Sequence, residues 1–204
     1  MRKMQIRIKY DYFIIGSYCM RLFSVFMQDF KNYKKKIIHG EKIILRPLLA
    51  KDMVSCLTWL KDPEVNKYLN QNYDNLTIEQ ELQWFNFIQK SDNDIVFAII
   101  VKNNKKHIGN CALHKINWLE KTCEFGIVLG EKIYWNRGCG SDATRTIIKF
   151  AVEDLLLSKV TLHVYEYNLR AKKVYENCGF KFVKILKNEH FYDNRYWDTY
   201  EMEH

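Results

Sequence analysis

The chain has 204 residues, of which 48% are apolar and 27% charged, enough for one globular domain with a buried core. Its six cysteines are scattered without a CxxC pair, which argues against a zinc knuckle or a disulfide framework and favours reduced thiols in the cytoplasm. The net charge of +8 is concentrated in residues 1–40, which carry nine Lys or Arg and two Asp. The basic pI therefore describes this segment and says little about the partners of the remaining domain.

Residues 1–40 are predicted to be a basic extension of a domain that spans residues 41–204. Its two apolar runs, residues 12–20 and 22–27, are shorter than the ~18 residues of a membrane span, and no cleavage site of a signal peptide is visible. Three interpretations stay open. The segment is a solvated or packed extension, a basic arm for a membrane or nucleic acid, or a start upstream of a true initiator at Met20 or Met27.

The first elements of the domain are predicted to be one strand and two helices. Residues 43–47 predict a short strand that ends at its proline, which cannot donate to a ladder. Asp52 is placed to cap a helix that Pro63 ends or kinks. The run Thr77-Ile78-Glu79-Gln80 matches a capping box and predicts the start of the second helix.

The hydrophobic period then changes to that of strands. Residues 95–101, 107–113 and 122–129 are strand-like runs separated by polar turns. Because these turns are too short for crossover connections, the three strands are predicted to form an antiparallel meander.

From Asp142 the period is helical again. Two adjacent apolar stripes predict one buried face: Ala143, Ile147, Ala151 and Leu155, and Thr144, Ile148, Val152 and Leu156. This helix is long enough to connect the strand at 122–129 to a parallel strand at 159–164. A short helix ending before Gly179 and a hairpin of residues 180–186 and 196–202 complete a mixed α+β domain.

The segment Trp135-Asn136-Arg137-Gly138-Cys139-Gly140 precedes the long helix. Its glycines allow the backbone to approach an anion, and the helix start presents unpaired N–H groups, so the segment predicts a phosphate-bearing ligand. A P-loop is excluded because no Lys-Ser or Lys-Thr pair follows. The pattern Gly138-x-Gly140-x-x-Ala143, with Glu166 downstream, matches a dinucleotide fingerprint, but residues 130–137 separate it from its strand and too little chain follows.

The same segment resembles the acyl-CoA pyrophosphate loop of the GNAT superfamily of N-acetyltransferases, with Trp135 where that family has Arg or Gln. Three further motifs of the family follow the same order in this chain. They are Asn168-Leu169-Arg170-Ala171, Val174-Tyr175-Glu176-Asn177-Cys178-Gly179-Phe180 and, resembling the ribosomal-protein-alanine acetyltransferase-like branch, Leu45-Arg46-Pro47 with Asp52 and the closing residues 190–198. The resemblance runs from about residue 41 to the end and leaves the extension uncovered.

The resemblance implies a GNAT fold, a central and mostly antiparallel twisted sheet with one parallel pair, flanked by helices. It also implies acetyl-CoA as co-substrate, with its pantetheine arm on the fourth strand and its pyrophosphate on main-chain amides. The residues implied to bind it are Ile127, Val128, Leu129, Asn136, Arg137, Gly138, Cys139, Gly140, Ser141, Asn168 and Ala171. Without the resemblance, the loop could be a tight turn that binds nothing, and Asn168 a turn residue at a strand end.

Two residues are predicted to be catalytic. The resemblance makes Tyr175 the acid that protonates the departing thiolate, although its place on an apolar helix face also fits a core aromatic. Glu124 is predicted to be the base that accepts a proton from the amine, through water, although it also fits an exposed strand carboxylate. The amine is expected to attack the thioester directly, since no His–Cys pair is legible.

The acceptor is expected to be a primary amine on a small molecule or peptide: a protein N-terminus, a polyamine or an amino-sugar. Acids and aromatic side chains in loops are candidates to bind it, namely Tyr68, Tyr73, Asp74, Tyr192, Asp193 and Trp197. The histidines have no ligand spacing, so no metal is expected. We expect a monomer or homodimer with no nucleic-acid or membrane partner. Two alternatives stay open, an acyl-CoA-binding module without catalysis and a nucleic-acid or membrane binder that acts through the basic extension.

Overall fold

The computed structural model describes residues 30–69 and 73–204. The apolar runs of the predicted extension, with Met20 and Met27, lie outside the described residues. The chain divides into two units with a boundary after Lys36. In the first unit residues 30–33 are helical, and every element named below belongs to the second. None of the helices in the described residues is long and apolar enough to cross a membrane.

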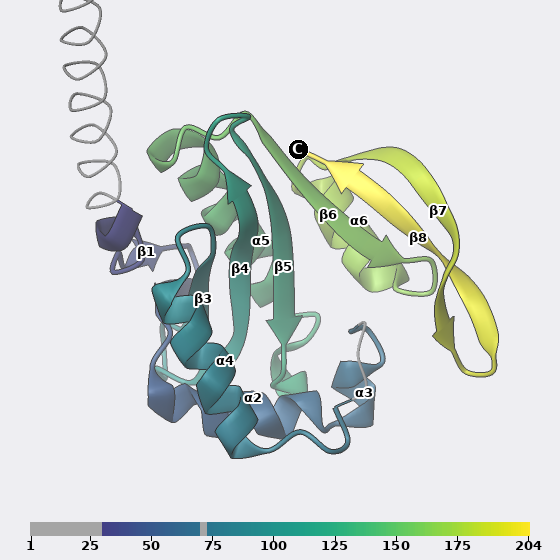
Figure 1. Cartoon of the computed structure of the whole chain (residues 1–204), viewed down its shortest axis with the longest axis horizontal. Coiled ribbons are helices and arrows are strands. Elements are labelled where there is room, and N and C mark those ends of the chain that lie inside the picture. The colour runs from purple at the N-terminus through teal and green to yellow at the C-terminus, as the bar shows by residue number, and fades with distance from the viewer. Residues whose placement is uncertain (1–29, 70–72) are drawn as a thin grey trace, which may run out of the picture. The chain divides into compact units, whose positions relative to one another are not determined.

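The centre of the domain is one eight-stranded sheet with the order β1-β2-β3-β4-β5-β6-β8-β7 (Figure 1). Neighbouring strands are antiparallel except β5 and β6, which are parallel. The strands are β1 (Ile38–His39), β2 (Ile43–Pro47), β3 (Ile95–Val101), β4 (His107–Asn117), β5 (Thr122–Leu129), β6 (Lys159–Tyr165), β7 (Lys181–Tyr192) and β8 (Arg195–Glu203). This topology confirms the predicted fold class and the predicted parallel pair.

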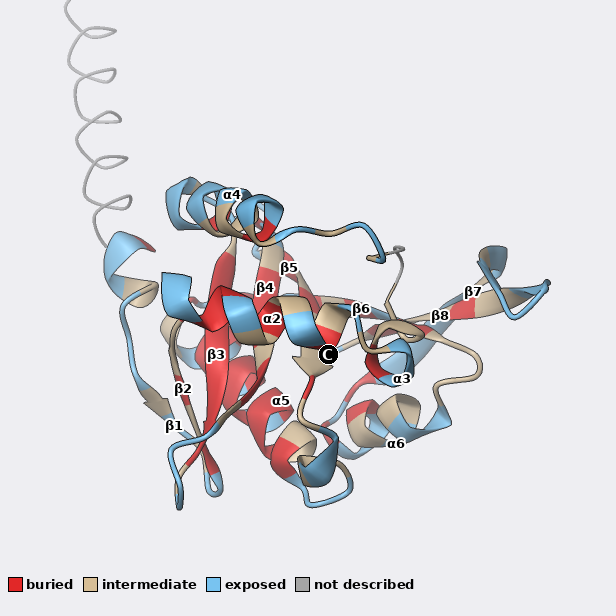
Figure 2. Cartoon of the chain, turned by 90° about the horizontal axis from the view of Figure 1, so that it is seen from below, coloured by how far each residue is buried: buried red, intermediate tan, exposed pale blue. Residues whose placement is uncertain are grey.

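Helices cover both faces of this sheet (Figures 1 and 2). They are α2 (Met53–Leu60), α3 (Pro63–Asn66), α4 (Ile78–Lys90), α5 (Cys139–Lys149) and α6 (Leu169–Asn177). The buried strand β3 shows how the two faces differ. Val96, Ala98 and Ile100 join the cluster under α2 and α4, whereas Phe97 meets Phe150 just after α5, with ring centroids 5.6 Å apart. Since both faces are covered, all of β3 is buried and its sequence is continuously apolar.

The helix signals of the first half have mixed outcomes. The capping box is confirmed, because Gln80 Oε1 accepts from the Thr77 N–H at 2.9 Å and α4 begins at the next residue. Pro63 does end the first helix and begins α3. Asp52 was predicted to cap α2, but it makes no cap there. Its carboxylate instead accepts two hydrogen bonds from Arg46 at 2.6 and 2.8 Å, because the short turn η1 (Ala50–Asp52) folds it back onto β2.

The long helix departs from its predicted stripes near its end. The stripe from Ala143 to Leu155 is buried as predicted. In the second stripe Thr144 and Ile148 are buried, but Val152 and Leu156 are exposed. The cause is a π-helical turn, η3 (Phe150–Asp154), which follows α5 and shifts the phase of the later residues.

The final hairpin is longer than predicted. Strand β7 continues to Tyr192 and β8 begins at Arg195. Asp193 and Asn194 form the turn between them, with φ of 53° and 57°. Positive φ at both central residues is the geometry of a tight hairpin turn, which Asp and Asn tolerate.

Candidate active site

Strands β5 and β6 are paired over only part of their length. The parallel ladder joins residues 122–124 to residues 159–161 and then stops. Beyond it the strands diverge, and Figure 1 shows the gap widening toward the C-terminal end of β5. The edge of residues 125–129 that faces β6 is therefore left without a strand partner, and its backbone groups can pair with an extended ligand.

The segment after β5 turns sharply before α5 begins. Asn136 and Gly138 both have positive φ, 58° and 81°, which lets the chain reverse and aim the start of α5 at the gap. Gly138 is the N-cap of α5 and supplies no side-chain cap. The first N–H groups of the helix are therefore not occupied by a capping side chain, which is the arrangement that binds anions.

Two cations lie beside this segment. The Lys42 ammonium donates to the main-chain oxygen of Arg137 at 3.0 Å. The Arg170 guanidinium lies 4.0 Å from the centre of the Trp135 ring, and Trp135 itself donates to the oxygen of Leu129 at 2.7 Å. Trp135 is the residue that departs from the family motif. Arg170 stacked on its ring brings a positive charge to the place where the motif residue is missing.

Residues of helix α6 line the same cavity, and Asn168 is the N-cap of this helix. The side-chain oxygen of Asn168 accepts from the Ala171 N–H at 3.2 Å, so the residue caps the helix and keeps its amide N–H₂ available. Tyr175 follows on the same helix and packs edge-on against Phe125, with centroids 6.1 Å apart. Burial raises the pKa of Tyr175, so its hydroxyl stays protonated at neutral pH and can donate a hydrogen bond or a proton.

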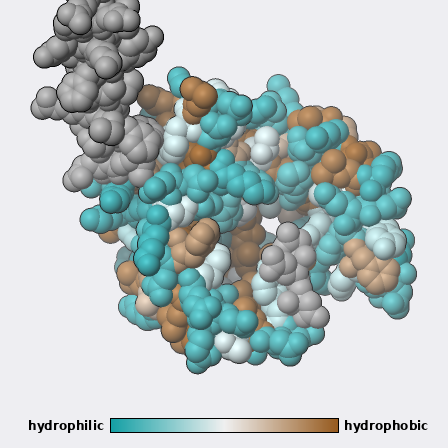
Figure 3. Space-filling model, viewed as in Figure 1, coloured by the Kyte–Doolittle hydropathy of each residue, from teal (hydrophilic) through white to brown (hydrophobic). Residues whose placement is uncertain are grey.

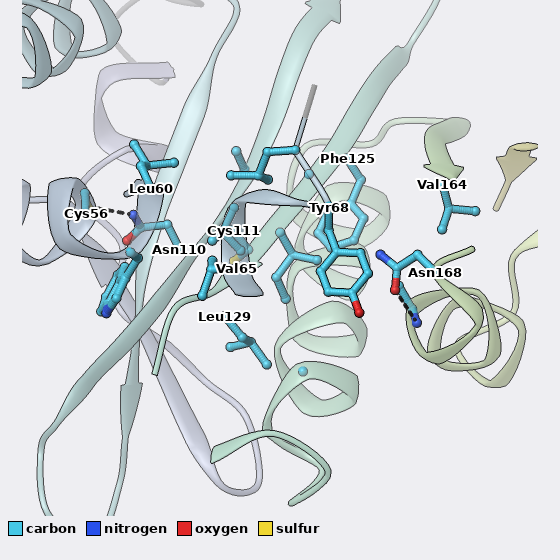
Figure 4. Close-up of a pocket in the computed structure, with 18 of the residues that line it drawn as sticks. Cys56, Leu60, Val65, Tyr68, Asn110, Cys111, Phe125, Leu129, Val164 and Asn168 are labelled. Atoms are coloured by element: carbon cyan, nitrogen blue, oxygen red, sulfur yellow. Dashed lines mark hydrogen bonds between the residues drawn. The ribbon is translucent and has the colours of Figure 1, made fainter. Parts of the chain in front are cut away.

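These elements enclose a cavity of about 1320 Å³. Figure 3 shows the surface hollowed between the body of the domain and the half that carries the hairpin. Figure 4 shows that side chains from α2, β5 and the start of α6 surround it, among them Cys56, Phe125 and Asn168. The cavity lining includes Tyr175, Glu124 and most of the residues predicted to bind the cofactor, namely Ile127, Val128, Leu129, Asn136, Gly138, Gly140, Ser141, Asn168 and Ala171.

Two residues predicted to bind the cofactor do not line the cavity. Arg137 is exposed on the outside of the turn, and Cys139 is buried as the first residue of α5. Arg137 and Cys139 differ in burial because the chain turns tightly between them. Their side chains therefore contribute little to the cavity, and only their main-chain groups stay candidates for a phosphate.

Glu124 lines the cavity but has cationic neighbours. Its carboxylate accepts from the Lys115 ammonium at 2.7 Å and lies 3.5 Å from Nδ1 of His163. Burial alone would raise the pKa of Glu124, but Lys115 and His163 outweigh it and lower the pKa below the usual value. A proton acceptor works best with a pKa near the working pH, so this environment favours a structural ion pair over the predicted role as a base.

The predicted acceptor residues fall into two groups. Tyr68 and Tyr73 line the cavity, whereas Asp74, Tyr192, Asp193 and Trp197 do not. Tyr167 connects the groups, because its ring lies 6.0 Å from that of Tyr68 and 5.3 Å from that of Tyr192, and its hydroxyl donates to the oxygen of Lys67. Asp193 forms part of the turn between β7 and β8.

The sequence of the domain matches a known protein family. Residues 42–181 match the model of the acetyltransferase (GNAT) domain. The chain belongs to the GNAT acetyltransferase family. Most of the residues in the predicted motifs of that family line the cavity.

The chain is also similar to individual proteins over most of its length. The chain is 27% identical over 166 residues to an uncharacterised N-acetyltransferase p20 of Bacillus licheniformis, covering 80% of this chain and 92% of that protein. It is 25% identical over 162 residues to an uncharacterised protein of Methanocaldococcus jannaschii, covering 78% of this chain but only 32% of that longer protein. A spermidine N-acetyltransferase from Vibrio cholerae, solved with CoA and spermine, has the same fold, with a TM-score of 0.75 at 23% identity over 81% of this chain and 96% of that one.

The thiols of this GNAT domain are poor nucleophiles. The five described cysteines are all buried and free. Burial raises the pKa of Cys56 and of Cys123 to about 12, and it also raises the pKa of Cys139 and Cys178. A thiolate is needed for attack on a thioester, so none of these groups is prepared to carry the acyl group. Within the described residues, no cluster of His, Cys, Asp or Glu is arranged to hold a metal ion.

Sequence reasoning missed two residues of the cavity. Arg170 was part of a recognised motif, but only the structure shows it stacked on Trp135. Glu81 is a buried carboxylate on α4 that lines the cavity. The sequence offered one indication of its burial. Glu81 lies next to Leu82 among the residues of α4 that face the sheet.

Proposed function

We propose that this protein is an N-acetyltransferase that moves the acetyl group of acetyl-CoA to a primary amine by direct attack. The observation that carries the proposal is the convergence of three parts on one cavity. These are the unpaired edge of β5, the uncapped start of α5 after Gly138, and the Tyr175 hydroxyl on α6. Each part matches one need of the reaction: a site for the pantetheine arm, a site for the pyrophosphate, and a donor for the leaving thiolate.

The chemistry requires few groups beyond these. The amine nitrogen forms a bond to the thioester carbon, and the carbonyl oxygen gains negative charge. Main-chain N–H groups of Ile127 to Leu129 on the open edge of β5 are the candidates to stabilise that charge. When the carbon–sulfur bond breaks, the thiolate takes a proton from Tyr175, and the amine loses a proton to solvent or a carboxylate. Most of the rate gain comes from positioning.

A thiol-release assay with acetyl-CoA and a panel of amines tests the proposal. Stoichiometric release of CoA and formation of an N-acetyl product with at least one amine is the expected result. Tight binding of acetyl-CoA with no release for any amine would instead identify a binding module without catalysis. A chain shortened to residues 37–204 should keep the activity, because the described cavity is built entirely from the second unit.

A further inference from the structure

Glu81 differs from the other buried carboxylates among the described residues. Asp52 is paired with Arg46, and Asp142 accepts hydrogen bonds from the main-chain N–H groups of residues 41–43. The side chain of Glu81 has no hydrogen bond or ion pair to any described residue, although the residue is only 6% exposed. Burial raises the pKa of Glu81, because no described cation beside it stabilises its charge, and an ammonium group that enters the cavity would stabilise the carboxylate.

The carboxylate of Glu81 faces the cavity. In the described residues, the fully enclosed side-chain atoms without a partner are His107 Nδ1 and Thr199 Oγ1, and the oxygens of Glu81 are not among them. Glu81 lines the cavity together with Tyr73 and with Trp84, which lies one turn further along α4. Burial raises the pKa of Tyr73, and the nearby charge of Glu81 raises it further. A cation that enters the cavity can therefore reach Glu81 between aromatic side chains.

The charges of the cavity limit how many cations it can hold. Among the described lining residues, the carboxylates are Glu81 and Glu124, and Glu124 is already paired with Lys115 and His163. The Lys or Arg side chain in the lining is Arg170, which lies over the ring of Trp135, in the segment before α5. Glu81 is therefore the lining carboxylate that has no described counter-charge beside it. A polyamine would bring several ammonium groups into a cavity that offers only one unpaired carboxylate.

We propose that Glu81 binds the ammonium group of the acceptor, and that the acceptor carries a single ammonium on an uncharged body, as an amino-sugar does. This inference rests on the proposed N-acetyltransferase function and specifies its acceptor. The aromatic rings of Tyr73 and Trp84 suit the apolar face of a sugar ring as well as the ammonium. The Vibrio cholerae structure of the same fold holds spermine, so the inference separates this chain from that neighbour in acceptor class.

Glu81→Gln is the direct test, because it keeps the shape of the side chain and removes its charge. Glu79→Gln is the matched control, since Glu79 lies in the same first turn of α4 but is exposed outside the cavity lining. The acceptors are glucosamine, an alanyl peptide amide with one ammonium, and spermidine. The single-ammonium acceptor that releases more thiol is used for both variants.

The expected result has three parts. Wild-type protein shows a higher kcat/KM for the single-ammonium acceptor than for spermidine. Glu81→Gln raises the KM for that acceptor at least tenfold and leaves the KM for acetyl-CoA unchanged. Glu79→Gln leaves both KM values within twofold. The melting temperature of Glu81→Gln should equal or exceed that of the wild type, because the variant removes an unpaired buried charge.

The outcomes separate this inference from the proposed function. Absence of thiol release from the wild type with every amine would overturn the proposed function. Activity of the wild type with an unchanged acceptor KM in Glu81→Gln would overturn the role of Glu81 alone. A higher kcat/KM for spermidine would overturn the single-ammonium acceptor.

Discussion

The two ends of the cavity are built by different means. At the end formed by α5 and α6, the main chain shapes the site, because Gly138 has a positive φ and the start of α5 has no side-chain cap. At the end formed by α2, α3 and α4, side chains shape the site, and Glu81 has no partner among the described residues. The first end suits a ligand recognised by its phosphates and amides, and the second suits a ligand recognised by its charge. The variants below test that division, from the largest expected effect to the smallest.

Tyr175→Phe should cause the largest loss, because it removes the donor for the leaving thiolate and keeps the ring that packs on Phe125. We expect kcat to fall by about 100-fold, in the range typical of an acid that acts in the transition state, with little change in the Kd of acetyl-CoA. Steady-state kinetics and calorimetry measure the two quantities. Tyr196→Phe, an exposed hairpin tyrosine, is the control. A kcat within twofold of the wild type would remove Tyr175 from the mechanism.

Gly138→Ala should weaken acetyl-CoA binding by about tenfold. The alanine would have to adopt a φ of 81°, and its Cβ would lie 3.1 Å from the Lys42 ammonium. The turn that aims α5 at the cavity would therefore be distorted. Gly179→Ala is the matched control, because Gly179 also has a positive φ, 92°, and its Cβ would lie 3.2 Å from His204, outside the cavity lining. Calorimetric titration with acetyl-CoA measures both. Equal affinities for the two variants would argue against a phosphate site at this turn.

Arg170→Gln should raise the KM for acetyl-CoA about fivefold and leave the acceptor KM unchanged. The expected loss is that of one cation held over an aromatic ring, about 1 kcal/mol. Lys173→Gln on the same helix is the control, since Lys173 is exposed and outside the cavity lining. If Arg170→Gln changed the acceptor KM instead, the assignment of the two ends would be reversed.

Glu124→Gln should have the smallest effect on catalysis. The pKa of Glu124 is lowered, so its carboxylate is ionised throughout the neutral range and its titration produces no limb of the pH–rate profile there. We expect the pH–rate profile between pH 6 and 9 to keep its shape. Because the folded-state pKa is depressed, any stability from the ion pair with Lys115 is present above the unfolded pKa and lost as pH falls through the folded pKa. An acidic limb that is present in the wild type and lost in the variant would restore Glu124 as the proton acceptor.

The contrast between the two ends also explains what could be predicted from sequence. The antiparallel meander of β3, β4 and β5, the parallel pair and the capping box of α4 follow from local periodicity and short connections, so they were predictable. The end of the cavity formed by α5 and α6 follows from glycines and motif residues that are close together in the chain. Asp52 was misassigned because its partner Arg46 competes with the helix cap, and Val152 because a π-turn shifts the helical phase.

Contacts between residues that lie far apart in the chain could not be predicted in the same way. Glu81 is unusual only because of what surrounds it in space, and nothing in its sequence position shows that it lacks a partner. Arg170 reaches Trp135 across a separation of many residues. Tyr192 and Trp197 were predicted at the acceptor site, but in the structure they contact Tyr167 and stay outside the cavity lining. Such placements depend on tertiary packing, which local patterns do not encode.

A crystal structure of the protein with acetyl-CoA tests the central claim most directly. We predict that the diphosphate lies against the main-chain amides of residues 136–141, that the pantetheine arm follows the open edge of β5, and that the thioester sulfur lies within hydrogen-bonding distance of the Tyr175 hydroxyl. Acetyl-CoA bound elsewhere, with the gap between β5 and β6 empty, would contradict the account.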